Sequence, residues 1–214
     1  MPAAARVTDN TSHGPPLNPG PGSMTVSISF MPAWRALPAG VGDGLEQASS
    51  TMKSLMDSPA LTPPDATPKL VQVQAAATQS AAAAAANGNP SAPGAVSGAF
   101  GTLTGVNSGL TAAYASASAV PGGQPAATQA YTQGIKAAAA AAASAAFATI
   151  ASMVDMHMCP IPCPVPPHGP GVVTQASTTV FIDNLPAVRQ GDNVIEACGG
   201  SDSISKGDPT VDIG

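Results

Sequence analysis

The feature that most constrains this chain is a short pattern that occurs near both of its ends. A His-Gly-Pro triplet, a Thr-Val-x-Ile run and a Pro-Ala-x-Arg run follow one another in residues 13–35, and the same series returns in residues 168–189. The step from the Val of the second run to the Pro of the third is six residues in both copies. A shortened third copy, Thr-Val-Asp-Ile, occupies residues 210–213. This spacing predicts one small β domain of repeated units that a long insertion divides in two.

A second repeated pattern, Arg-x-x-Asp, locates the insertion. An Arg and an Asp three positions apart on a tight bend can pair and hold a turn between strands. A third copy would begin at Arg35, but the chain departs at Pro38 and the missing Asp returns as Asp155. We therefore predict a repeat domain formed by residues 1–36 and 155–214, with an insertion at 37–154. The predicted turn residues are Arg6, Asp9, Arg35, Asp155, Arg189 and Asp192.

The composition excludes a large aromatic core. Charged residues make up 9% of the chain, where about 25% is usual, and aromatic residues make up 3%. Much of the apolar content is alanine, which buries little area per residue. A small domain of this kind needs a metal, a partner or regular β pairing for stability. The net charge is −5 with only seven Lys and Arg residues, so we expect no nucleic-acid partner.

The residues between Thr25 and Phe30 alternate in polarity and predict a half-buried strand, with Val26, Ile28 and Phe30 on its apolar face. Pro32 is expected to end it.

The insertion is rich in Ala, Gly and Pro and carries no charge from Val71 to Ile135. Three interpretations stay open for this segment: a soluble Ala-rich bundle, a helical hairpin able to enter a bilayer, and partial disorder. Alanine is nearly neutral for membrane insertion, so hydropathy alone does not decide among them. The predicted helices lie at 43–57, 72–86, 94–120 and 126–154, with a Pro-rich linker at 59–68.

Histidine and cysteine placement predicts a metal site. All three histidines lie in the repeat regions and none in the insertion. His157 and Cys159 are two apart, so on an extended strand their side chains share a face. The predicted ligands are His13, His157, Cys159 and His168, with Cys163 and Cys198 as alternatives for the thiolate. The competing interpretation is that these are ordinary structural histidines and a buried apolar cysteine.

The expected metal is a structural zinc ion rather than a catalytic one. A catalytic zinc site keeps a position open for water and usually has a carboxylate base beside it. The chain has two glutamates, Glu46 and Glu196, and the sequence places neither near the predicted ligands. A cysteine protease pair would also need a third orienting residue and an oxyanion hole, for which there is no signal. We therefore expect no enzymatic activity.

These motifs resemble PAAR-repeat proteins, the sharpened tips of contractile injection machines, chiefly the type VI secretion system. The resemblance rests on the two Pro-Ala-x-Arg runs, the Thr-Val-x-Ile runs and the Gly-Asp that follows Arg189. Residues 4–13, Ala-Ala-Arg-Val-Thr-Asp-Asn-Thr-Ser-His, are similar to the segment called prePAAR. In that family this segment completes the PAAR fold and supplies a zinc-ligand histidine.

The resemblance implies a mainly β, conical PAAR domain with pseudo-threefold repeats, α+β overall once the helical insertion is counted. It implies a trimeric β-helix spike of the VgrG type as partner, with the cone's base on the spike and zinc near its point. Inserted regions in such proteins often carry transmembrane helices bound by a chaperone, and a toxin domain often follows. This insertion is Ala-rich rather than strongly apolar, and the chain reaches Gly214 with its last repeat, so we expect no C-terminal toxin.

The resulting functional prediction is a non-enzymatic spike tip that helps to puncture an envelope and carries or recruits an effector through its insertion. The alternative is that the insertion itself is a membrane-perturbing effector that contacts the target membrane. The N-terminus has no basic start followed by an apolar run. We therefore expect a protein that stays cytoplasmic until it is loaded, and that an injection system then exports to the target envelope.

Overall fold

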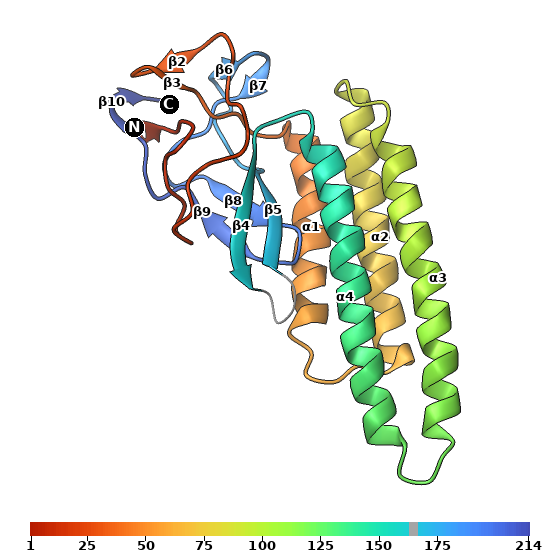
Figure 1. Ribbon diagram of the computed structural model, residues 1–214. Coiled ribbons are helices and arrows are strands. Elements are labelled where there is room, and N and C mark those ends of the chain that lie inside the picture. Colours follow the sequence, from red (N-terminus) through yellow and green to blue (C-terminus); the bar gives the residue numbers. More distant parts are fainter. Residues whose placement is uncertain (163–166) are drawn as a thin grey trace.

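Strands and helices form two parts that lie side by side in the computed structural model, which describes residues 1–162 and 167–214 (Figure 1). The helices of the described residues form an up-and-down bundle. The strands gather along one side of it and include a curled antiparallel sheet, so the chain is mixed α+β. The helices are α1 (Ala39–Met56), α2 (Pro63–Ala86), α3 (Ala92–Ser118) and α4 (Gln124–Ala151).

The start of α2 differs most from its predicted position. Residues 59–68 were expected to be a linker, but the helix begins at Pro63. Thr62 and Asp65 form a capping box, in which the Asp65 carboxylate accepts a hydrogen bond from the Thr62 backbone N–H at 3.1 Å. Pro63 is well suited to the first helical position, where no N–H is needed. These local signals outweigh the helix-breaking effect expected of the later Pro68, which lies inside the helix.

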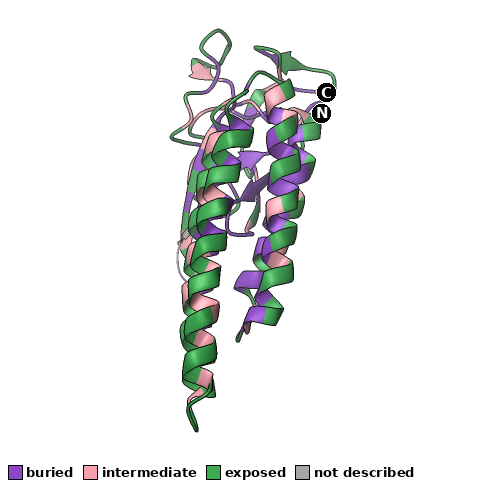
Figure 2. Ribbon diagram, turned by 90° about the vertical axis from the view of Figure 1, so that its right-hand side faces the viewer, coloured by how far each residue is buried: buried purple, intermediate pink, exposed green. Residues whose placement is uncertain are grey.

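The bundle is packed closely at one end and exposed at the other. Helix α1 buries one face whose large residues include Leu45, Met52 and Leu55. Helix α3 buries only residues in its first half, ending at Leu103. Beyond that point α3 and the start of α4 form a two-helix tip that extends past α1 and α2 and is mostly exposed (Figure 2).

The largest sheet among the described residues has four antiparallel strands in the order β4-β5-β8-β9. Three further two-stranded pairs are β1–β10, β2–β3 and β6–β7. The strands are β1 (Ala3–Ala4), β2 (Ser27–Ile28), β3 (Met31–Pro32), β4 (Met156–Pro162), β5 (Pro167–Val173), β6 (Phe181–Ile182), β7 (Leu185–Pro186), β8 (Asn193–Glu196), β9 (Ser201–Ser203) and β10 (Asp208–Asp212).

A closed ring of three backbone hydrogen bonds lies at the centre of the strand part. Ala5 N–H donates to the carbonyl of Val188 at 2.9 Å, and Val188 N–H donates to the carbonyl of Trp34 at 3.1 Å. Trp34 N–H completes the ring by donating to the carbonyl of Ala5 at 3.0 Å. All three side chains are buried in one apolar cluster. The ring therefore joins three segments that are far apart in the sequence.

Two short hairpins, β2–β3 and β6–β7, have the same backbone form. The central turn residues are Ser29 and Phe30 in the first and Asp183 and Asn184 in the second, and all four have positive φ. Such turns suit the twist of a two-residue hairpin, and Asn and Asp adopt them more readily than bulky residues do. The prediction of a half-buried strand through Phe30 is therefore wrong, since the chain turns there and the Phe30 side chain is fully exposed.

The bundle and the sheet share one core. Val172, Ile195 and Cys198 of the strand part belong to the same buried cluster as the inward faces of the helices. Ser49 of α1 donates a hydrogen bond to the Glu196 carbonyl at 2.9 Å, and Thr174 donates to the Glu46 carboxylate at 2.6 Å. Helix α1 therefore packs directly over the sheet.

One helix in the described part of the chain, α4, is long and apolar enough to cross a membrane. Half of its most apolar window is buried inside the protein. A core helix of a soluble bundle passes the same test, so this observation is weak evidence for a membrane span.

Candidate metal centre

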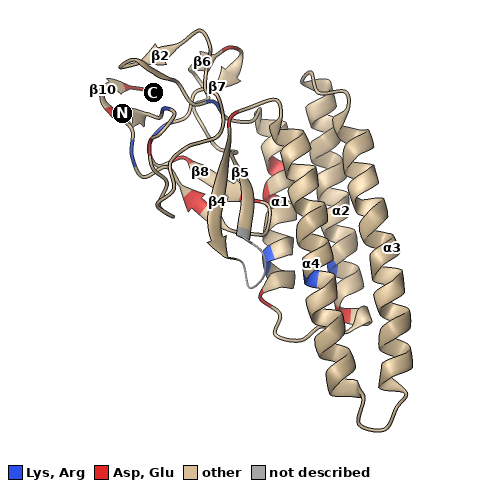
Figure 3. Cartoon of the chain, viewed as in Figure 1, with Lys and Arg blue, Asp and Glu red and all other residues tan. Residues whose placement is uncertain are grey.

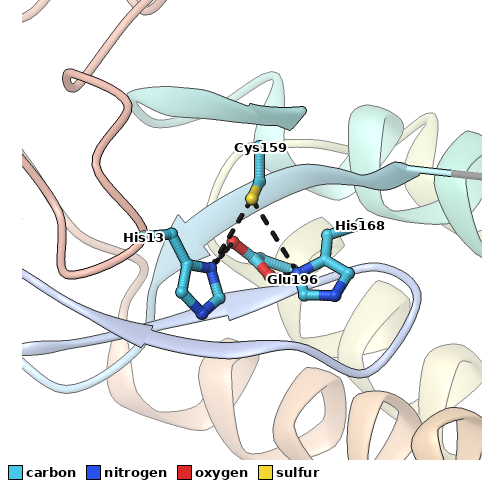
Figure 4. Close-up of side chains that lie close together, drawn as sticks. All are labelled: His13, Cys159, His168 and Glu196. Atoms are coloured by element: carbon cyan, nitrogen blue, oxygen red, sulfur yellow. Dashed lines mark hydrogen bonds and ion pairs between the residues drawn. The ribbon is translucent and has the colours of Figure 1, made fainter. Parts of the chain in front are cut away.

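Four side chains with metal-binding atoms converge between the N-terminal segment and the four-stranded sheet (Figure 4). Cys159 lies on β4, His168 on β5 and Glu196 on β8. The strand register brings them together, because Cys159 pairs with Gly169 and Gly171 pairs with Glu196. His13 reaches them from the loop that follows the bridge between Thr11 and Ile204.

The separations of these atoms suit a single small cation. One donor atom from each of the four residues lies within 4.8 Å of all the others. Cys159 Sγ lies 3.5 Å from His13 Nδ1 and 3.8 Å from His168 Nδ1. Glu196 Oε1 lies 3.1 Å from His13 Nδ1. A tetrahedral zinc site with N, O and S ligands has donor atoms about 3.3–3.8 Å apart, from its usual bond lengths.

A second, overlapping group consists of His157, Glu196 and Asp202, all of them buried. His157 Nε2 lies 3.5 Å from Glu196 Oε1. Among the described residues, neither ring nitrogen of His157 makes a hydrogen bond, and the same holds for Asp202 Oδ2. Glu196 Oε2, in contrast, lies 2.5 Å from His168 Nδ1. Buried polar atoms without partners are uncommon in folded proteins and are often ligands of an ion or a water molecule.

The two ionisable groups with large pKa shifts at this site are the thiol and the glutamate. Burial, together with a hydrogen bond to Glu196, raises the pKa of Cys159 to about 12. Burial also acts to raise the pKa of Glu196, but contacts with His157 and Cys159 and the charges of His168 and His13 outweigh it and lower the value to about 2. A cation at this point would favour the thiolate form of Cys159, because metal binding displaces the thiol proton.

Two glycines make the room that these side chains occupy. A Cβ at Gly200 would lie 1.9 Å from Glu196 Oε2 and 2.6 Å from His168 Nδ1. A Cβ at Gly171 would lie 2.7 Å from Cδ2 of the His157 ring. A pocket of about 250 Å³ opens beside the centre, lined in part by His13, His168 and Cys198.

The structure brings together three of the four predicted ligands, His13, Cys159 and His168, and places the fourth, His157, against Glu196. The expectation that no glutamate lies near the cluster is wrong, because Glu196 lies at its centre. The sequence did hold a signal for this position, because Glu196 directly follows the apolar residues Val194 and Ile195. A charged residue in such a buried run often has a functional partner. Of the alternative thiolates, Cys198 lines the neighbouring pocket, and Cys163 lies outside the described residues.

Comparison with known proteins locates a family motif at this end of the chain. Residues 165–214 match the family model of the PAAR motif. This part of the chain carries a PAAR motif. No curated protein and no solved structure gave a match. A PAAR motif indicates a spike-tip role in type VI-like systems, with export by such a system and a spike partner of the VgrG type.

The PAAR motif includes two of the four converging residues, His168 and Glu196, while His13 and Cys159 come from outside it. It also includes Arg189, whose backbone N–H and guanidinium both donate to the Asp192 carboxylate. The predicted turn residues outside the motif make the same kind of contact. Arg6 pairs with Asp9, and Arg35 pairs with Asp155 across 120 positions of sequence.

Proposed function

We propose that this PAAR protein is the non-enzymatic tip of a contractile injection spike, and that it caps a trimeric β-helix of the VgrG type. The observation that carries the proposal is the ring of backbone hydrogen bonds through Ala5, Trp34 and Val188. Each ring residue is followed by an arginine that is bound to an aspartate through its backbone N–H and its side chain. Three like sides around one axis would let a single chain match a threefold partner.

The proposed docking base is the end of the strand part that holds the two hairpins and both chain termini (Figure 1). Ile28, Ile182 and Ile213, one from each repeat, are buried together beneath it. Large apolar side chains are exposed on the hairpins and on the residues that lead into them, which is unusual for a surface that stays in water. They are Met24, Val26, Phe30, Val180 and Phe181.

We further propose that a structural zinc ion occupies the candidate metal centre, with His13, Cys159 and His168 as ligands. The sequence prediction assigns the fourth position to His157, and the geometry adds Glu196 as a candidate. The N, S and O donor set and the unpartnered buried atoms support this assignment. When bound, zinc would link the N-terminal segment to the sheet, since His13 and Glu196 are 183 positions apart.

In this proposal residues 37–154 are an insertion in the PAAR domain, and the helical bundle within it carries or recruits an effector or chaperone. Three hydrogen bonds from Arg35 to the Asp155 carboxylate support the split. They link the residues that flank the bundle, so the two parts of the strand domain meet there. The bundle surface suits contact with another protein more than with nucleic acid, since α3 and the tip carry no charge (Figure 3).

The capping proposal is tested by binding the full chain to a purified trimeric VgrG-type spike. We expect one chain per trimer, and an affinity loss of at least tenfold for a Phe30→Asp, Phe181→Asp double variant. A Val71→Asp, Val106→Asp double variant is the control, because those side chains are exposed on the bundle. Three chains per trimer, or equal losses in both variants, would contradict the proposal.

A second candidate function is that the helical tip perturbs a target membrane. The charge-free sequence from Val71 to Ile135 and the apolar length of α4 favour it. Full-length protein would then release dye from anionic lipid vesicles, and Val106→Lys on the exposed tip would reduce the release. Absence of leakage and of vesicle binding by the wild type would remove this candidate.

A further inference from the structure

A large groove lies on the helical bundle, and none of its lining residues belongs to the candidate metal centre. Its volume is about 980 Å³. The floor is one stripe of α4 that runs from Gln124 to Ala137, and the wall is formed by Pro59 and Ala60 of the segment between α1 and α2. Ligand pockets commonly measure about 300–1,000 Å³, so this groove has the size of a binding site.

The groove exists because α1 is much shorter than α4. Helix α1 has 18 residues and α4 has 28, which makes them about 27 and 42 Å long at 1.5 Å per residue. The end of α1 lies beside Lys136, since the Met56 carbonyl accepts a hydrogen bond from Lys136 Nζ at 2.6 Å. From there to Gln124, α4 continues past the end of α1 (Figure 1). The side of α4 that α1 would cover is therefore open over this length.

Hydrogen bonds hold the wall of the groove against α4 at both of its ends. Lys136 Nζ donates to the Ser58 carbonyl at 2.7 Å, and Leu61 N–H donates to Thr132 Oγ1 at 2.8 Å. Pro59 lies between these two points, and its ring fixes its backbone φ. The groove is therefore preformed, so a ligand loses little affinity to the ordering of its walls.

The side chains of the groove suit an extended peptide backbone. Gln129 and Gln133 are exposed in the stripe together with the half-buried Thr128, and each carboxamide offers two donors and an acceptor. An extended peptide has N–H and C=O groups that need such partners, whereas a helix pairs its own. Pro59 and Pro125 offer contacts to apolar side chains. The stripe is about 20 Å long, which is the length of about six extended residues.

One positive charge decides which peptides fit. Among the described lining residues, Lys136 alone is charged. It donates to the carbonyls of Met56 and Ser58, which are neutral, and an ammonium group has a third donor. Asp57, which directly follows α1, pairs with Lys53 instead. A carboxylate on the ligand would match the charge of Lys136, whereas a hydrocarbon ligand would leave the carboxamides of the groove without partners.

We propose that this groove binds an extended peptide segment of about six residues, with an acidic side chain of the segment at Lys136. The backbone of the segment runs along α4 toward Gln124 and forms hydrogen bonds with Gln129 and Gln133. The segment belongs to a protein that the tip carries. The inference therefore deepens the proposed recruitment of an effector by the bundle, and it rests on that proposal for the origin of the peptide.

An immobilised array of random heptapeptides, probed with the fluorescently labelled full chain, tests the proposal. We expect the bound peptides to be enriched in Asp or Glu, and to lose binding when that residue is replaced by Asn or Gln. Non-specific attraction would select basic peptides instead, because the net charge of the chain is −5. Selected peptides without an acidic residue would overturn the proposal.

The position of the bound peptide is checked by NMR of the nitrogen-15-labelled full chain. One selected peptide in solution should shift the side-chain amide signals of Gln129 and Gln133. Shifts confined to residues outside the groove would overturn the proposal. This measurement uses the wild-type protein and does not depend on any variant folding.

A pair of variants at one exposed position tests the role of the charge. Ala137 lines the groove, follows Lys136 and is exposed, so Ala137→Glu and Ala137→Lys should both fold. We expect the selected peptide to bind Ala137→Glu about two- to fivefold more weakly than the wild type, and Ala137→Lys at least as tightly as the wild type. Ala113→Glu is the control for the added charge, because Ala113 is exposed on α3 and does not line the groove. Equal affinities in the two Ala137 variants would overturn the proposal.

The outcomes separate this inference from the proposed recruitment. A wild-type chain that binds no array peptide, or that binds laurate in the groove but no peptide, overturns the inference. An effector that loads onto the same chain through another face then leaves the recruitment standing. Conversely, an acidic peptide bound in the groove of a chain whose assembled spike carries no other protein leaves the peptide site standing and removes only the recruitment.

Discussion

Gly200 shows at the scale of one residue how closely the candidate metal centre is packed. The nearest atoms to an added Cβ are the ends of the Glu196 and His168 side chains, rather than backbone. We therefore expect Gly200→Ala to keep the fold while displacing both groups, and to weaken zinc binding by about 10–100-fold. Isothermal titration with zinc checks this, with Gly109→Ala as control because open space surrounds that glycine. Equal affinities in the two variants would show that the cluster does not bind the metal.

The thiol of Cys159 predicts a pH dependence of zinc binding. Without metal its pKa is raised to about 12, so the thiol is protonated at neutral pH and each bound zinc must release that proton. The zinc association constant should therefore rise by at least about tenfold per pH unit over the neutral range. Cys198→Ser should keep this slope if Cys159 supplies the thiolate. A pH-independent affinity of the wild type would contradict the assignment.

At the scale of elements, the hairpin β2–β3 holds Phe30 in a backbone conformation with positive φ, which is unfavourable for a bulky residue. Phe30 has φ of 67°, and the matching residue of β6–β7 is Asn184 with φ of 65°. Copying the second hairpin with Phe30→Asn should stabilise the protein by about 1 kcal/mol, because Asn tolerates this backbone better. The melting temperature would rise by about 2–4 °C, while affinity for a VgrG-type spike would fall.

Phe181 supplies the matched control for that prediction. It is exposed on β6 but its φ is not positive, so Phe181→Asn should reduce spike affinity without a gain in stability. A loss of stability in Phe30→Asn would mean that the aromatic side chain supports the fold rather than a partner.

The sequence predicted those elements whose signals are local. Helix α3 follows from alanine content between Pro and Gly residues, and its predicted and observed ends differ by two residues. The start of α2 was misplaced because the capping box at Thr62 outweighs the nearby prolines. The short hairpins and the position of Glu196 depend on strand register between distant segments, which the order of residues along one strand does not reveal. The match to the PAAR motif supports the resemblance drawn from Pro-Ala-x-Arg and Thr-Val-x-Ile.

At the scale of the whole molecule, the tip of the helical hairpin contributes little to the packed core. Among residues 108–130, Ala127 alone is buried. Replacing 108–130 by a short glycine linker should therefore change the melting temperature by less than about 4 °C and leave the zinc content unchanged. Circular dichroism melting and metal analysis of the deletion check this. A large loss of stability would show that the tip is part of the fold and not an exposed projection.

The long-range contacts of the strand part also set an order of folding. Each helix can pair with its neighbour as soon as that neighbour is made, but Arg35 must wait for Asp155, which is 120 positions later. At about 5–20 residues per second, a ribosome needs roughly 6–24 s to cover that distance. During this time the N-terminal strands have open edges and no sheet to join, which exposes them to wrong pairing. Early formation of the bundle would help such a protein to fold. It brings the start of α1, which follows the N-terminal segment, close to the end of α4, from which the later strands continue.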